Sequence, residues 1–246
     1  ATPDPLWSRG LGDVYKRQGS TEPAALQAKV LGEGADVGIA FDGDGDRLQM
    51  VNAKGELLTG DDVLYVLAMH RLAKGGSDAG IVGTLMTNMG LELALEADGL
   101  RLARAKVGDR YVKELMVAEG WSLGGESSGH IICGDLSTTG DGVIAALQVL
   151  AAVRASGKSL EALASGFNPL PQVLVNVHIT KGFDLSAYST IAEACRRVES
   201  ELKGRGRLLL RPSGTEPVIR VMVEGDDTVA IDSLADEVAD AIRQAA

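Results

Sequence analysis

The sequence has little cysteine, few aromatic residues and no long apolar run. Its two cysteines, Cys133 and Cys195, are too few for a disulfide framework or a four-ligand zinc site, so we expect a reducing, cytoplasmic compartment. The longest apolar run is about half of the ~20 residues that a membrane-spanning helix requires, and the N-terminus lacks a signal-peptide pattern. The sequence therefore predicts a protein with no membrane segment.

An excess of positive charge is also missing. The chain has 24 lysines and arginines against 34 aspartates and glutamates, which gives a net charge of −10. Proteins that bind nucleic acid use a basic face to neutralise phosphates, so we expect no nucleic-acid partner. An anionic ligand must instead be captured by a local group of residues.

Glycine, in contrast, is abundant, with 31 residues in 246 against a usual share of about 7%. Short apolar runs alternate with helical patterns between residues 36 and 156, which predicts an α/β domain with a mixed, mostly parallel sheet and helices on both faces. The segment GFNPLP at residues 166–171 interrupts the pattern and predicts a boundary. The remaining strands and two helices predict a smaller α+β domain with an antiparallel sheet.

A first candidate site is the acidic loop, residues 42–47, with the sequence DGDGDR. In an extended segment side chains two residues apart lie on one side, so the three aspartates could converge. Oxygen ligands without histidine or cysteine favour Mg²⁺, Ca²⁺ or Mn²⁺. An EF-hand is excluded, because Arg47 stands where that loop requires glycine and Ala53 where it requires glutamate. A solvated acidic turn is the alternative.

A second candidate is the glycine-serine loop, residues 124–130, with the sequence GGESSGH. Glycines on both sides of a carboxylate, two hydroxyls and an imidazole expose polar groups to a ligand rich in hydroxyls. A sugar is the natural ligand, and an ordinary polar turn is an equally open alternative.

The third candidate is the arginine loop, residues 211–217, with the sequence RPSGTEP. Hydroxyls, a glycine and adjacent arginines make an anion-binding concavity that suits phosphate. Four arginines and one acid between residues 205 and 220 give a local charge of +3. A plain hairpin connection is the alternative.

The three loops, in this order, resemble those of the α-D-phosphohexomutase superfamily. Within it, the bacterial phosphoglucosamine mutase branch is similar in four segments: AKVGDRYV (105–112), GGESSGHII (124–132), TTGDG (138–142) and RPSGTEPVIRVMVEG (211–225). The resemblance covers residue 19 to the C-terminus. It implies the end of a second domain at 19–58, a third domain at 59–168 and a fourth domain at 169–246. Residues 1–18 match nothing and are expected to be a disordered or artefactual leader.

The resemblance also implies roles for individual residues. Mg²⁺ would be bound by Asp42, Asp44 and Asp46, and Arg47 would be the catalytic residue that steadies the phosphoryl group. The substrate's hydroxyls would be bound by Glu126 and Ser128, with His130 nearby. A loop that discriminates among sugars would contain Gly108, Asp109 and Arg110. The non-reacting phosphate would be bound by Arg211, Ser213, Gly214, Thr215 and Arg220.

The implied activity is the interconversion of glucosamine 6-phosphate and glucosamine 1-phosphate, through a phosphoserine and a bisphosphorylated sugar, for UDP-N-acetylglucosamine and peptidoglycan precursors. The superfamily's phosphoserine loop does not occur in the sequence. We therefore expect a C-terminal fragment that is inactive without its N-terminal domain, and no oligomeric state is predicted. Ser127 leaves a phosphoglucomutase or phosphomannomutase as an alternative, and a non-catalytic sugar-phosphate-binding remnant is another.

Overall fold

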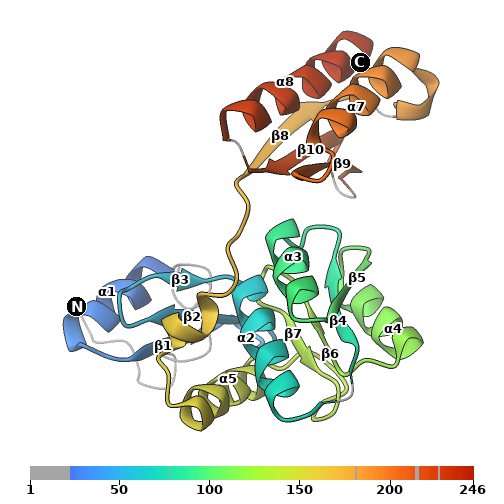
Figure 1. Cartoon of the computed structure of the whole chain (residues 1–246). Coiled ribbons are helices and arrows are strands. Elements are labelled where there is room, and N and C mark those ends of the chain that lie inside the picture. The colour runs from blue at the N-terminus through green and yellow to red at the C-terminus, as the bar shows by residue number, and fades with distance from the viewer. Residues whose placement is uncertain (1–22, 77, 181, 214–215, 227) are drawn as a thin grey trace. The chain divides into compact units, whose positions relative to one another are not determined.

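The computed structural model describes residues 23–76, 78–180, 182–213, 216–226 and 228–246. The predicted leader at 1–18, and Gly214 and Thr215 of the arginine loop, lie outside the described residues. The chain divides into two compact units between Asn168 and Pro169, and Figure 1 shows the elements of each.

The first unit begins with helix α1 (Pro23–Glu33) and a small antiparallel sheet. Its strands β1 (Val37–Phe41), β2 (Leu48–Asn52) and β3 (Leu57–Leu58) lie in sequence order. Phe41 pairs with Leu48 at the end of the first two strands. The acidic loop is therefore the connection of a β-hairpin.

A second sheet in this unit has the order β5-β4-β6-β7. Strand β4 (Gly80–Thr84) pairs in parallel with both β5 (Arg101–Ala105) and β6 (Leu123–Gly125), and only β7 (Ile131–Cys133) is antiparallel. The predicted mixed, mostly parallel sheet is confirmed. Because parallel strands end at the same edge of a sheet, the segments that follow β4, β5 and β6 come together there.

Helices cover both faces of this sheet, as predicted. Successive side chains of a strand point to opposite faces. Ile81 accordingly belongs to the main core, which includes buried residues of α2 (Gly60–Ala73), α3 (Met89–Ala97) and α5 (Gly142–Ser156). Its neighbour Val82 packs in a separate cluster with residues of α4 (Asp109–Glu119). A short helix that the sequence pattern did not indicate, α6 (Leu160–Ala164), ends the unit.

The start of α2 is fixed by a capping box. The Thr59 side chain accepts a hydrogen bond from the backbone of Asp62, and the Asp62 carboxylate accepts one from Thr59 N at 2.7 Å. These bonds satisfy N–H groups that a helix leaves without partners at its first turn. The cap therefore sets the direction of Gly60 and Asp61, which lie against the glycine-serine loop.

The second unit is an antiparallel three-stranded sheet with the order β8-β10-β9, as predicted. Its elements are β8 (Gln172–His178), a 3₁₀ turn (Leu185–Ala187), α7 (Ser189–Leu202), β9 (Gly206–Pro212), β10 (Val218–Gly225) and α8 (Thr228–Ala245). Alternate residues of β10, namely Ile219, Val221 and Val223, share a core with residues of α7 and α8. The intervening residues, Arg220 among them, point to the other face of the sheet.

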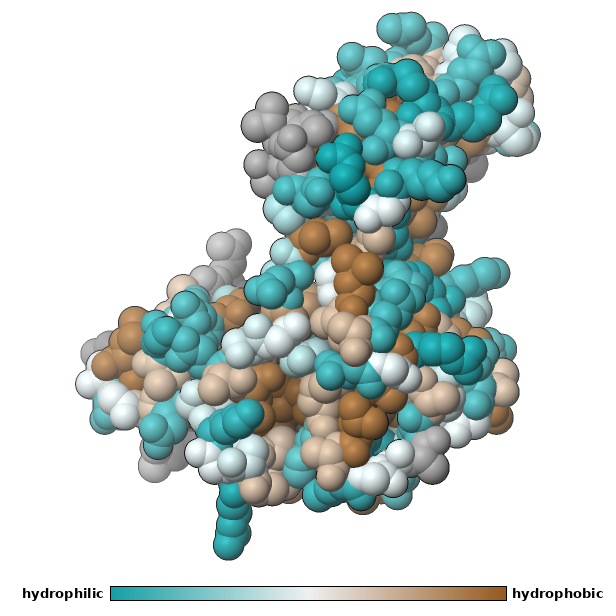
Figure 2. Space-filling view, in the orientation of Figure 1, coloured by the Kyte–Doolittle hydropathy of each residue, from teal (hydrophilic) through white to brown (hydrophobic). Residues whose placement is uncertain are grey.

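The surface is mixed in character. On the face seen in Figure 2, hydrophobic side chains lie in patches among hydrophilic ones. Within the part of the chain that the structure describes, no helix is both long and apolar enough to span a bilayer.

Helix α3 offers a matched test of the main core. Leu91 is fully buried, whereas Leu93, on the same helix, is 45% exposed. Leu91→Ala is expected to lower the free energy of unfolding by about 2–5 kcal/mol, because it removes apolar contacts and leaves a cavity. Leu93→Ala should change it by less than about 0.5 kcal/mol. Urea unfolding followed by circular dichroism measures both, and equal losses would contradict the core assignment.

Candidate functional site

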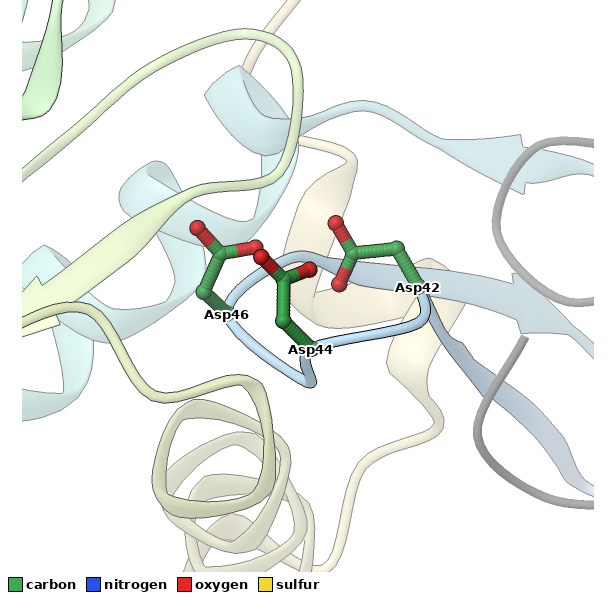
Figure 3. A group of neighbouring side chains, drawn as sticks. All are labelled: Asp42, Asp44 and Asp46. Atoms are coloured by element: carbon green, nitrogen blue, oxygen red, sulfur yellow. The ribbon is translucent and has the colours of Figure 1, made fainter. Parts of the chain in front are cut away.

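Three carboxylates come together in the acidic loop, as Figure 3 shows. Asp42, Asp44 and Asp46 each offer an oxygen atom, and these oxygens all lie within 4.8 Å of one another. The loop is a turn and not the extended segment that the sequence argument assumed. Gly45 N donates to Asp42 O at 3.2 Å, and its φ of 75° is one that glycine adopts without strain. The turn, and not strand alternation, brings the carboxylates together.

One oxygen of the cluster is buried without a partner. Oδ1 of Asp46 makes no hydrogen bond to any described residue, while Oδ1 of Asp42 accepts one from Arg47 N at 3.0 Å. A buried polar atom without a partner costs free energy unless a ligand supplies one. Carboxylate oxygens are the ligands that Mg²⁺ and Ca²⁺ prefer. The donor set therefore fits a hard divalent cation.

The acidic loop and the glycine-serine loop are joined through the backbone. Leu48 N donates to Gly129 O at 3.0 Å, and Arg47 forms an isolated antiparallel bridge with His130. A Cβ atom at position 129 would lie 2.1 Å from Leu48 O, and Gly129 has a φ of 94°. Only glycine allows this approach. The two loops thus form one site.

A side-chain contact strengthens the same joint. His130 is buried, with its Nδ1 atom 3.2 Å from Oδ2 of Asp46. Its Nε2 atom is also buried and has no hydrogen-bond partner in the described ranges. Gly140 packs closely against the ring, since a Cβ at that position would lie 2.1 Å from Nε2. The imidazole therefore contacts an acidic-loop carboxylate and orients it.

A third segment reaches the glycine-serine loop from the end of β5. Gly108 N donates to Oε1 of Glu126 at 2.8 Å, which leaves the other carboxylate oxygen for a ligand. Ser128 is exposed on the same loop. Asp109 and Arg110 are exposed in the first turn of α4, and Arg110 pairs with the glutamate one turn further along that helix. The structure thus brings Gly108 to Glu126 and leaves Asp109 and Arg110 at the surface.

Asp61, in the first turn of α2, is not among the site residues predicted from the sequence. The structure buries it to 3% exposure beneath the glycine-serine loop. Its Oδ1 accepts a hydrogen bond from Ser127 Oγ at 3.0 Å, and its Oδ2 accepts one from Asn88 N at 2.9 Å. Burial raises the pKa of Asp61 to about 6, although these two bonds lower it. The available signal was its place on the apolar face of the helix, three residues before Leu64.

The arginine loop lies in the second unit. Arg211 and Arg220 are directly opposite each other on β9 and β10, where like charges repel. The Nε atom of each is buried and finds no hydrogen-bond acceptor among the described residues. Ser213 N donates to Val218 O at 2.8 Å and closes the loop. The two guanidinium groups form a concentration of positive charge that an anion would neutralise.

A cavity of about 270 Å³ lies elsewhere in the first unit. It is lined by Gly80 and Ser122, at or next to the first residues of β4 and β6, and by Arg71 and Asp135, which form an ion pair at 2.6 Å. Because it lies where the parallel strands begin, it is separate from the loops where they end.

Comparison with protein families identifies both units. Residues 59–170 match the model described as "Phosphoglucomutase/phosphomannomutase, alpha/beta/alpha domain III", and residues 174–241 match the model of the C-terminal domain of the same family. The chain belongs to the phosphohexomutase family. The resemblance drawn from the three loops is confirmed.

Two similar curated relatives of this phosphohexomutase have the same name. The chain is 54% identical over 233 residues to a phosphoglucosamine mutase of Cellvibrio japonicus and 55% identical over 227 residues to one of Aeromonas hydrophila. These matches cover 95% and 92% of this chain but 52% and 51% of the relatives. The chain thus spans about half the length of the curated relatives it matches.

Solved structures agree on the fold. A phosphoglucomutase/phosphomannomutase family protein of Burkholderia thailandensis matches 92% of this chain and 51% of its own, with a TM-score of 0.71 and 23% identity. An N-acetylphosphoglucosamine mutase of Aspergillus fumigatus, crystallised with GlcNAc-6P and magnesium, matches 83% of this chain and 52% of its own, with a TM-score of 0.66 and 22% identity.

The raised pKa of Asp61 predicts a pH dependence of stability. With a native pKa of about 6 against an ordinary 3.8, Asp61 stabilises the fold only when protonated, fully below pH 3.8, and this contribution is lost as the pH rises through 6. Asp61→Asn replaces the titrating carboxyl by a neutral amide, so this loss of stability does not occur in the variant. We therefore expect its stability relative to the native protein to increase by about 2–3 kcal/mol between pH 4 and pH 7.5.

Denaturant unfolding across this pH range measures the effect. Glu96→Gln, which removes one carboxylate from an exposed position on α3, is the matched control. A pH-independent difference between Asp61→Asn and the native protein would contradict the prediction.

Proposed function

We propose that this chain forms the metal-, sugar- and phosphate-binding part of a phosphoglucosamine mutase. The whole enzyme interconverts glucosamine 6-phosphate and glucosamine 1-phosphate in the cytoplasm, and so supplies UDP-N-acetylglucosamine for peptidoglycan precursors. The observation that carries the proposal is the joint between the acidic and glycine-serine loops, in a chain about 54% identical to relatives with that name.

The acidic loop holds Mg²⁺ in this proposal. The ion would be bound by Asp42, Asp44 and Asp46, whose oxygens converge and include a buried Oδ1 atom without another partner. When bound, the ion supplies positive charge that stabilises the phosphoryl group during transfer. Arg47, whose guanidinium is half exposed beside Asp42, adds a second positive charge as the catalytic residue.

The glycine-serine loop binds the sugar hydroxyls in this proposal. Glu126 keeps one oxygen for a hydroxyl while Gly108 N holds the other, and Ser128 offers an exposed hydroxyl. His130 supports this loop by orienting Asp46. Gly108, together with Asp109 and Arg110, contributes to the choice among hexose phosphates.

The arginine loop binds the phosphate that does not react. Arg211 and Arg220 bring positive charge, and their buried Nε donors have no acceptor in the described part of the second unit. Ser213 adds a hydroxyl. Gly214 and Thr215 complete the loop on the basis of sequence alone. Phosphoryl transfer requires charge neutralisation and alignment more than covalent help from the protein, and these residues supply both.

The proposal assigns residues 19–58 to the end of a second domain, 59–168 to a third and 169–246 to a fourth. The phosphoserine that passes the phosphoryl group to the sugar belongs to an N-terminal domain, which is the expected partner of this chain. A phosphoglucomutase or phosphomannomutase is the second candidate. Ser127 favours it, because the phosphoglucosamine mutase branch commonly has asparagine at this position of the glycine-serine loop.

Two substitutions separate the metal site from the phosphate site. Asp44→Ala is expected to weaken Mg²⁺ binding at least tenfold, because it removes one of three carboxylates, and to leave inorganic phosphate binding unchanged. Arg211→Ala should do the reverse. Isothermal titration of each variant with MgCl₂ and with phosphate measures both, and a variant that loses both ligands while folded would contradict separate sites.

Activity tests the whole proposal. Residues 1–246 should be inactive with glucosamine 6-phosphate and Mg²⁺ alone, because the proposal places the phosphoserine in the N-terminal domain. They should gain mutase activity when mixed with the N-terminal half of the Cellvibrio japonicus relative. The product is measured by a coupled assay for glucosamine 1-phosphate, with Asp44→Ala as the inactive control. Faster turnover of glucose or mannose phosphates would favour the second candidate.

A further inference from the structure

A buried carboxylate at the loop edge has no part in the proposed function. Asp61, in the first turn of α2, lies beneath two segments that follow the parallel strands β4 and β6. One is the segment from residue 85 to Asn88, and the other is the glycine-serine loop. Both carboxylate oxygens are used, one by each segment. Gly60 N also donates to Ser127 O at 3.0 Å, so this turn of α2 supports the loop at two atoms.

We propose that Asp61 is a positioning residue that holds the glycine-serine loop in its ligand-binding form through Ser127. This inference rests on the proposed function only in taking that loop to bind the sugar. Asp61 touches no ligand and acts through its neighbour. Its substitution should therefore weaken sugar binding without removing any group that contacts the sugar.

The chemistry of the contact explains why a charged residue stands here. A carboxylate accepts from Ser127 Oγ and Asn88 N in charge-assisted bonds, which are stronger than neutral ones. Burial of the charge is unfavourable, so a residue chosen for stability alone would be neutral. The carboxylate is retained because it accepts two bonds at once and fixes the loop relative to the end of β4.

Protonation changes the direction of the bond to Ser127. A neutral carboxyl donates to Ser127 Oγ, whose own hydrogen then turns to the second acceptor within reach, Met86 O at 3.5 Å. The charged groups that act on Asp61 are Asp62, which raises its pKa, and Arg104 on β5, which lowers it. Both protonation states can therefore keep the contact between Asp61 and Ser127.

The effect of a substitution at Asp61 depends on which hydrogen bonds the new side chain can make. Asp61→Ala removes both acceptors and leaves Asn88 N and Ser127 Oγ without them. Asp61→Asn keeps an acceptor for Asn88 N and can donate to Ser127 Oγ, as the protonated carboxyl does. The conservative variant should rescue most of what the alanine variant loses.

Amide hydrogen exchange measured by NMR tests this without a ligand. The amides of Glu126 and Gly129 are hydrogen-bonded inside the loop. We expect them to exchange at least fivefold faster in Asp61→Ala than in the native chain, and to recover in Asp61→Asn. Glu96→Gln, which removes a carboxylate from an exposed position on α3, is the matched control and should leave the loop amides unchanged.

Two further measurements keep the proposal falsifiable. If Asp61→Ala does not fold, Ser127→Ala replaces it, and the carboxyl titration of Asp61 followed by ¹³C NMR should shift to higher pH because a stabilising hydrogen bond is gone. Unchanged loop exchange in a folded Asp61→Ala chain, equal acceleration in Glu96→Gln, or an unshifted titration in Ser127→Ala would overturn the proposal.

Sugar binding separates this proposal from the function. Titration with glucosamine 6-phosphate should give a dissociation constant at least fivefold weaker in Asp61→Ala than in the native chain, with Asp61→Asn between them at pH 7.5. Comparison at equal pH cancels the titration of the sugar's own phosphate. If the native chain binds no sugar phosphate while the exchange pattern holds, the proposed function fails and the positioning role stands.

Discussion

The site depends on one backbone contact between two hairpins. Leu48 N donates to Gly129 O where the β1–β2 and β6–β7 connections meet, and every other feature of the first-unit site is arranged around it. The contact requires a residue without a side chain at position 129. It also brings His130 next to Asp46, so that a carboxylate of one loop is oriented by the imidazole of the other. A change in the geometry of the acidic loop therefore also changes the geometry of the glycine-serine loop.

The start of α5 ties the same region to the core. Gly142 N donates to Gly45 O at 2.9 Å, and the side chain of Asp141 caps the helix by accepting from Ile144 N. One short segment thus closes the acidic loop, packs against His130 through Gly140 and begins a helix that is buried along one side. Rigid elements of this kind hold functional groups more accurately than free loops do.

Much of this arrangement could be predicted from the sequence, and the reasons are local. The alternation of apolar runs with helical patterns predicts the α/β unit, and the DGDGD spacing indicates oxygen ligands whatever the backbone conformation. The role of Asp61 could not be read in this way, because its place three residues before Leu64 indicates burial but not the bond to Ser127, which lies 66 positions along the chain. The link between His130 and Asp46 was equally hidden, since 84 positions separate the two residues and only the tertiary structure brings them together.

The pair of arginines in the second unit has a consequence for the fold itself. Arg211 and Arg220 face each other across neighbouring strands, and their repulsion works against the pairing of β9 with β10. An anion between them would convert that repulsion into attraction on both sides. If an anion binds here as proposed, the sheet would be most stable with that anion in place, because binding to the native state adds to the free energy of folding. The stability of this unit would then depend on the anions of the buffer as well as on the sequence.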